Sequence, residues 1–259
     1  MPTLRLRDAP QVPLDLSPLL PGAEIDADMP LRLGNRPVAL GELFELDPGP
    51  EDELRLVGTN ACCDRIGAGL SRRRIVVEGD AGACTGLGMT GGEIEVWGSA
   101  DALAGGEMSG GVLRIRGDAG ERLGGALPGT GGMSGGAILL TGGCGPRAGE
   151  RMRKGLIVVG GEAGPHVAFG MRGGTIVVHG ACAAEPAGSM RRGTLYLAKA
   201  PGRLLPTFSD DGAHELLWLA LLERHLRGLG GAPALPSRRV RRWAGDLADL
   251  GKGELLVAA

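Results

Sequence analysis

The sequence lacks the features that place a chain in or across a membrane. No apolar run approaches the roughly 18 residues that a membrane-spanning helix needs, although hydrophobic residues make up 43% of the 259-residue chain. The opening residues, MPTLRLRDAP, have neither the basic stretch nor the apolar core of a secretory signal. We therefore expect a cytoplasmic protein with no membrane partner.

Two further shortages concern nucleic acids. The formal net charge is −2, so the chain has no basic excess that would attract a phosphate backbone. Aromatic residues make up only 3%, too few for platforms on which bases stack. We expect no nucleic-acid partner.

Paired cysteine spacings are also missing. The chain has five cysteines, an odd number, and no Cys-x-x-Cys spacing. A disulfide framework is not expected in a reducing cytosol, and no zinc ligand set is indicated. We expect no metal bound to this chain.

What the sequence has in abundance is a repeat. The segments MRKGLIVVGG, MRGGTIVVHG and MRRGTLYLAK begin at Met152, Met171 and Met190, a constant interval of 19. The first large aliphatic residues of all the repeats keep this interval, over Leu56, Ile75, Ile94, Leu113, Ile138, Ile157, Ile176 and Leu195. The one exception is the step from Leu113 to Ile138, which has six extra residues before Met133. A fixed period of about 20 residues is the mark of a solenoid.

The pattern inside each repeat indicates a strand with one face inward. Aliphatic residues alternate, as in Ile75 and Val77. A glycine follows, and then a slot for a small residue, which includes Cys62, Cys144 and Cys182 as small buried side chains. Equivalent strands would stack ~4.8 Å apart in parallel.

This pattern predicts an all-β fold, a parallel β-helix of 19-residue coils. We expect the helix to be right-handed. Left-handed β-helices are built from hexapeptides, with an aliphatic residue at every sixth position, and the present repeat is not a multiple of six.

The two ends of the stack need covers, since open sheet edges invite association. We expect residues 1–50 to form an N-terminal cap, 51–200 the β-helix, and 201–259 a C-terminal helix and tail. The helix is predicted to be amphipathic and to begin at Ser209 or Asp210, which are N-cap candidates. We expect this helix, or another protein, to cover an apolar outer stripe formed by Leu139, Val158, Val177 and Tyr196.

A search for catalytic residues finds no constellation. Position 218, four after His214, is Trp and not the His of a zinc protease helix. His166 and His179 lie in different slots of neighbouring repeats, and no Ser-His-Asp or Cys-His arrangement follows from spacing. Glu95 and Arg114 share a slot and suggest an ion pair, but no ladder of carboxylates indicates a sugar-cleaving enzyme. We expect no catalytic residues.

One slot carries an unusual run of charge. Arg153, Arg172 and Arg191 occupy the same position of three successive repeats. Stacking like charges ~5 Å apart costs on the order of 1 kcal/mol per neighbour even in water. Either these arginines are simply solvated, or they form a binding surface for an anionic partner or an extended anionic carrier.

The repeats MTGGEIEVWG, MSGGVLRIRG and MRGGTIVVHG, with the tail GDLADLGKGELL, resemble the C subunit of formylmethanofuran dehydrogenase. They also resemble its bacterial relative, the C subunit of the formyltransferase/hydrolase complex. The likeness spans roughly residues 50–259. The repeated unit also occurs in the C-terminal domain of the glutamate synthase large chain, whereas the tail favours the C subunits.

The resemblance implies a non-catalytic scaffold subunit in one-carbon metabolism. Its partners would be hydrolase, formyltransferase and B-type subunits, which pass formyl groups from formyl-tetrahydromethanopterin through a methanofuran-type carrier to formate. This chain itself would bind no cofactor. The archaeal dehydrogenase subunit and a glutamate synthase-type domain in an amidotransferase assembly are alternatives. Only three of the 28 basic residues are lysine, a composition typical of high-GC bacteria that favours the bacterial complex.

Overall fold

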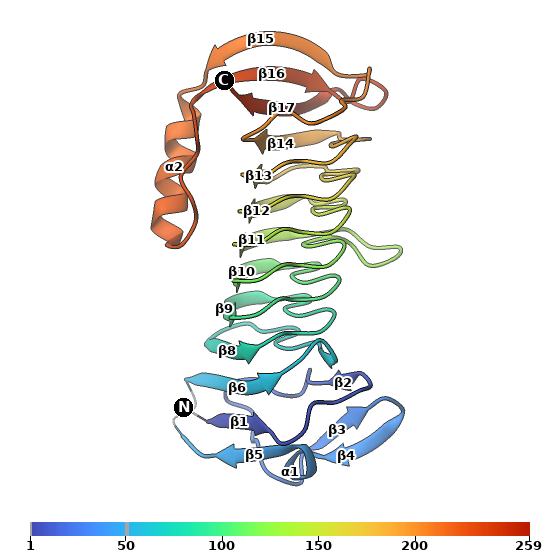
Figure 1. Cartoon of the computed structure of the whole chain (residues 1–259), viewed down its shortest axis with the longest axis vertical. Coiled ribbons are helices and arrows are strands. Elements are labelled where there is room, and N and C mark those ends of the chain that lie inside the picture. The colour runs from blue at the N-terminus through green and yellow to red at the C-terminus, as the bar shows by residue number, and fades with distance from the viewer. Residues whose placement is uncertain (1, 50–51) are drawn as a thin grey trace.

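The computed structural model describes residues 2–49 and 52–259, which form a tall stack of strands with few helices (Figure 1). One sheet of 13 described strands runs along its whole length, in the order β15-β16-β17-β14-β13-β12-β11-β10-β9-β8-β6-β1-β5. Neither described helix has the length and apolar character required to cross a bilayer.

The middle of this sheet contains the repeats, and their strands pair in parallel. The strands are β6 (Glu53–Thr59), β8 (Arg74–Gly79), β9 (Thr90–Val96), β10 (Ser109–Ile115), β11 (Ser134–Leu140), β12 (Lys154–Val159), β13 (Thr175–Val178) and β14 (Arg192–Leu197). Ile94 lies opposite both Ile75 and Leu113, and the same register continues to Leu195. The aligned aliphatic residues are fully buried.

The predicted register is wrong in the first repeat. Leu54, and not Leu56, lies opposite Ile75, while Leu56 lies opposite Val77. Both leucines are buried and alternate in the same way. A two-residue shift therefore leaves the inward pattern unchanged, and spacing cannot detect it.

The structure explains the Met-x-Gly-Gly unit. The six methionines of this slot form an inner column of fully buried side chains: Met89, Met108, Met133, Met152, Met171 and Met190. A Cβ on Gly110 would lie 2.2 Å from the Thr90 carbonyl oxygen, and Gly111 has a φ of +81°. Glycine lets the chain turn this corner close against the repeat below, and the second position is glycine in every one of these repeats, whereas Lys154 and Arg192 occupy the first position in two of them.

A second, thinner ladder follows the predicted slot of small residues. Single parallel bridges connect Ala81 to Ala100 and continue through Ala119, Cys144 and Ala163 to Cys182. Cys144 and Cys182 are buried, as expected. The prediction for Cys62 is wrong: it is only half-buried, whereas its neighbour Cys63 is fully buried and pairs with Leu14.

The six extra residues before Met133 leave the stack intact. Leu113 and Ile138 are direct partners across this interval. The added segment projects from the stack as the loop beside β11 in Figure 1.

The N-terminal strands occupy one end of the stack. β1 (Thr3–Leu6) pairs in parallel with β6 and antiparallel with the edge strand β5 (Phe44–Asp47). A four-stranded sheet lies beside them, in the order β4-β3-β2-β7. Its strands are β2 (Leu14–Asp15), β3 (Pro30–Leu33), β4 (Arg36–Ala39) and β7 (Cys63–Asp64), with the short helix α1 at Leu40–Leu43. The predicted boundary at residues 50 and 51 lies outside the described residues.

The C-terminal segment differs from the prediction. Residues Ser209–Glu215 form strand β15, and helix α2 begins only at Trp218 and ends at Leu229. The tail adds two strands, β16 (Arg239–Gly245) and β17 (Lys252–Ala258). β17 is parallel to β14, and β16 is antiparallel to both β17 and β15. The predicted helix start is therefore wrong, because Ser209 and Asp210 pair with Ala244 and Trp243 of the distant β16.

The apolar outer stripe is covered, as predicted, by α2 and the segment after it. Leu219 and Leu226 of α2, with Leu235 and Val240, bury the stripe formed by Leu139, Val158, Val177 and Tyr196. Tyr196 is fully buried, and its hydroxyl donates a hydrogen bond of 2.8 Å to the Ser237 carbonyl oxygen. Burying one such side chain contributes about 1.5–3 kcal/mol, so this cover is a second core outside the stack.

Candidate functional site

The three predicted arginines occupy one position of successive repeats. The backbone N–H groups of Arg153, Arg172 and Arg191 donate to the carbonyl oxygens of Met133, Met152 and Met171, at 2.8, 2.7 and 2.8 Å. All three side chains are exposed. The equivalent residues of earlier repeats are Thr90, Ser109 and Ser134, so the cationic run is confined to the C-terminal half of the stack.

Further cations lie beside these arginines. Lys154 and Arg192 each follow an arginine of the run, and Lys252 lies opposite Arg192. We call this surface the basic ribbon; it comprises Arg153, Lys154, Arg172, Arg191, Arg192 and Lys252. Arg191 pairs with Asp249 at 3.0 Å. Among residues 2–49 and 52–259, neither Arg153 nor Arg172 has an acidic side chain in ion-pair contact.

The outer face of the strands is divided into a charged half and a covered half. On β8, β9 and β10 it carries Arg74, Glu95 and Arg114, with Arg116 directly after β10, whereas from β11 onward it carries the apolar stripe. The predicted Glu95–Arg114 pair is wrong. Glu95 pairs with Arg74 and Arg116, since long side chains reach diagonally across strands. Burial alone would raise the pKa of Glu95, but these two guanidinium groups lower it below its ordinary value.

Arg114 instead connects the two halves. Its Nε donates to Glu93 Oε1 at 2.7 Å, and one terminal nitrogen donates to the Gly230 carbonyl oxygen at 2.7 Å. The other terminal nitrogen donates to the Leu229 carbonyl oxygen. These carbonyls stand at the C-terminal end of α2, where a cation is favourable. Sequence reasoning missed this role, because it depends on a segment that is remote along the chain.

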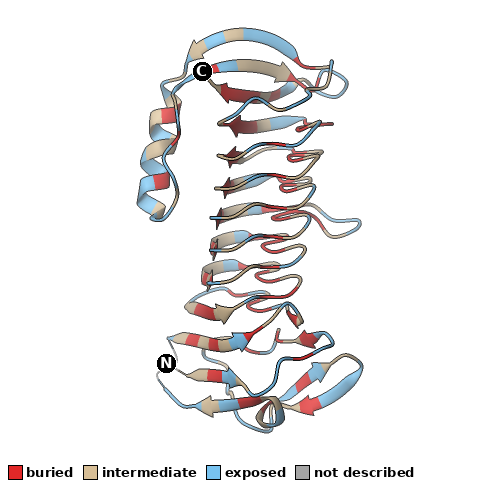
Figure 2. Cartoon of the chain, in the orientation of Figure 1, coloured by how far each residue is buried: buried red, intermediate tan, exposed pale blue. Residues whose placement is uncertain are grey.

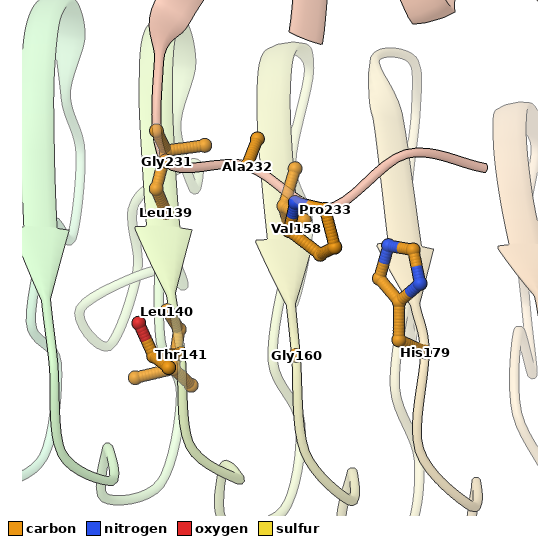
Figure 3. A pocket seen from close by; sticks show the side chains of 9 residues that line it. All are labelled: Leu139, Leu140, Thr141, Val158, Gly160, His179, Gly231, Ala232 and Pro233. Atoms are coloured by element: carbon orange, nitrogen blue, oxygen red, sulfur yellow. The ribbon is translucent and has the colours of Figure 1, made fainter. Parts of the chain in front are cut away.

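A cavity of about 470 Å³ lies where the segment after α2 crosses the stripe (Figure 3). It is lined mainly by apolar or small residues, with Leu139 and Val158 from the strands and Gly231, Ala232 and Pro233 above them. Only Thr141 and His179 bring functional groups. Burial lowers the pKa of His179, and its Nε2 atom is enclosed without a hydrogen-bond partner among the described residues.

The residues that line the cavity do not include two side chains that could act together as a catalytic pair. A neutral imidazole could act as a base, but none of the nine lining residues is an acid, a cysteine or a lysine. His166 lies elsewhere, and its ring makes a T-shaped contact with the ring of Phe169. Burial raises the pKa of the Cys144 and Cys182 thiols to about 11 and about 12, so both are protonated at neutral pH and poor nucleophiles.

Metal ligands do not gather in the part of the chain that the structure describes. There, no group of three or more His, Cys, Asp or Glu side chains could hold a metal ion. The described surface thus offers a basic ribbon, a charged strand face and a cavity beneath the segment after α2. These features are those of a repeat protein whose stacked parallel strands form long exposed surfaces.

Comparison with known proteins identifies the family within that class. No protein-family model matches the chain. Over its whole length it resembles a chain in the crystal structure of the formyltransferase/hydrolase complex from Methylorubrum extorquens, determined with methylofuran. The identity is 38%, the TM-score is 0.91, and 99% of each chain is covered. The C subunit of that complex, from the same species, is 53% identical over 57 residues, which are 22% of each protein.

The likeness to the solved chain holds at 38% identity over almost the entire length of both chains. The chain therefore belongs to the family of the C subunit of the formyltransferase/hydrolase complex.

Proposed function

We propose that this chain is the non-catalytic scaffold subunit of a formyltransferase/hydrolase complex. Its partners would be hydrolase, formyltransferase and B-type subunits, which transfer formyl groups from formyl-tetrahydromethanopterin through a methanofuran-type carrier and release formate. The observation that carries this proposal is the full-length likeness to a chain of the bacterial complex. It favours that complex over the archaeal dehydrogenase and the glutamate synthase-type assembly.

We propose a cytoplasmic location and a right-handed parallel β-helix for the scaffold. All five cysteines are free, which suits a reducing compartment. The continuous ladder of strands and the ladder of single bridges give each repeat two parallel contacts with its neighbour. Connections between parallel strands of one sheet are right-handed in about 98% of cases. This supports a right-handed β-helix.

Purification of the tagged chain from its native host tests the assembly. We expect the hydrolase, formyltransferase and B-type subunits to accompany it in fixed ratios, and formate release to require those subunits. Isolation with amidotransferase subunits, or with a tungsten or molybdenum dehydrogenase, would contradict the proposal. Turnover by the isolated chain would contradict the non-catalytic role.

We further propose that the basic ribbon binds an anionic surface of a partner subunit or an anionic part of the carrier. Support comes from the exposure of Arg153 and Arg172 without acidic partners among the described residues, and from the repeated placement of like charges. Holding such charges ~5 Å apart does not favour folding. A binding role would account for them.

Changing Arg153, Arg172 and Arg191 together to glutamine tests the ribbon. Folding should persist, since surface changes usually alter the free energy of unfolding by within about ±0.5 kcal/mol. Assembly or formyl transfer in the purified complex should weaken, and the wild-type interaction should weaken as salt rises.

The matched control changes Arg7, Arg32 and Arg36 to glutamine, which removes the same charge from exposed positions near the N-terminus. This control should assemble and transfer formyl groups as the wild type does. Equal effects of the two triple variants would mean that the ribbon is ordinary solvated surface.

A further inference from the structure

Helix α2 has a second apolar face that points away from the stack. Its inward residues Leu219 and Leu226 are buried against the stripe, whereas Leu217 and Leu221 are 83% and 68% exposed. In Figure 2 the helix stands beside the strands with large pale-blue areas. We call Leu221, Arg224, His225 and Gly228, together with Leu217 at the N-cap directly before the helix, the outer face of α2.

The spacing of this face is that of a helix-packing seam. Residues 217, 221, 224 and 228 follow the i, i+4, i+7, i+11 pattern, which places side chains in one row on a helix. The row begins with two leucines and ends at Gly228, where no side chain prevents close approach. A shallow hollow of about 460 Å³ lies at this end, lined by Leu221, Arg224, His225, Gly228 and Leu229.

The two formal charges on and beside this face, on Arg224 and Arg227, are both positive. Arg224 and His225 are exposed on the outer face, and Arg227 is exposed on its flank. The helix has a single acid, Glu223, which is half-buried and accepts hydrogen bonds from Arg238 at 3.0 and 2.6 Å. The one acid of the helix is therefore engaged by Arg238, and neither Arg224 nor Arg227 has an ion-pair partner on its own helix.

The helix itself is held firmly, as a docking element requires. Arg114 binds the carbonyls at its C-terminal end, and Leu219 and Leu226 anchor its inner side. A partner would meet a pre-formed surface, with little ordering cost.

We propose that the outer face of α2 docks a helix of another subunit. That helix would place apolar side chains against Leu217 and Leu221 and carboxylates against Arg224 and Arg227. The seam spacing argues for a helix, and the uncompensated cations argue for an acidic one. This inference rests on the proposed scaffold function and adds where one partner binds and with what chemistry.

The test uses the complex purified through the tagged chain from its native host. The double variant L217S/L221S should fold and melt as the wild type does, because both side chains are largely exposed. It should lose one subunit of the complex, or hold it at least ten-fold more weakly. The charge variant R224E/R227E should weaken retention of the same subunit.

The control is L247S/L250S, which changes two other exposed leucines, 60% and 53% exposed, in the turn between β16 and β17. It should retain every subunit. Full retention by L217S/L221S, or equal loss in the control, would overturn the docking surface while the proposed function stands. If the isolated chain forms a dimer that L217S/L221S disrupts, the outer face of α2 binds a second copy of this chain, and the proposal is overturned. A wild-type chain that brings no subunit would contradict the proposed function as well.

Discussion

Asp246 is a polar residue buried where the tail meets the last repeat. It is 4% exposed, and its carboxylate accepts hydrogen bonds of 3.0 Å from the backbone N–H groups of Ser189 and Ala248. Burial alone would raise the pKa of Asp246. The nearby Thr207 side chain, whose hydroxyl makes no hydrogen bond of normal geometry among the described residues, and the two N–H groups outweigh burial and lower the pKa below the ordinary value. The ionised form therefore stabilises the fold.

The variant D246N should reduce the free energy of unfolding by about 1–3 kcal/mol at pH 7, because it removes charge-assisted hydrogen bonds. A lowered folded pKa contributes stability that is fully present above the unfolded value of about 3.9 and is lost as pH falls toward the folded value. Urea unfolding of both proteins at several pH values measures this difference, which should shrink only in that acid range. The exposed control D8N should show no difference, and a loss independent of pH would contradict the assignment to the ionised carboxylate.

At the scale of elements, one residue of β10 binds the C-terminal end of α2, in addition to the leucines that anchor its inner side. Arg114 binds the Leu229 and Gly230 carbonyl oxygens and is itself oriented by Glu93. The variant R114M keeps the apolar stem but loses these bonds, and it should weaken the docking of α2 by about 1–3 kcal/mol.

Hydrogen exchange measures this prediction. Amides of residues 218–235 should exchange faster in R114M, while those of β8 and β9 stay protected. The matched control is R116M, at the position directly after the same strand. Arg116 contacts Glu95 and Trp97, and no hydrogen bond or ion pair joins it to α2 among the described residues. Equal exchange in the two variants would show that α2 is held by its leucines alone.

At the scale of the whole molecule, the C-terminal segment completes the stack and covers its side. β17 extends the sheet beside β14, and α2 covers the apolar stripe. Truncation after residue 201 would uncover Tyr196 and Val177 and leave β14 as an open edge. The truncated chain should self-associate or precipitate at micromolar concentration.

Size-exclusion chromatography with light scattering measures this association. The control deletes residues 126–131, as many residues as the long interval has in excess, and should stay as soluble as the full chain. Leu113 and Ile138 already pair across this loop, so its loss leaves neighbouring repeats in register. A soluble, monodisperse truncated chain would show that the cover is dispensable.

The stacking of the repeats follows from the amino-acid sequence alone. A periodic pattern of inward aliphatic residues specifies its own register, because each strand has its partner one period away. From Ile75 to Leu195 the aligned residues are direct partners. The outer stripe was predictable for the same reason, since alternation separates the two faces of a strand.

The two ends and the cover depend instead on contacts that form only in the folded chain. Leu54, and not Leu56, lies opposite Ile75, because a shift of two residues along the strand keeps the same set of side chains facing inward. Ser209 and Asp210 resemble a helix start, yet they lie in a strand whose partner is the distant β16. Arg114 reaches the end of α2 from the middle of the stack. Outside the repeat, strand partners and side-chain contacts are set by packing between distant segments, and local pattern carries no information about which segments will meet.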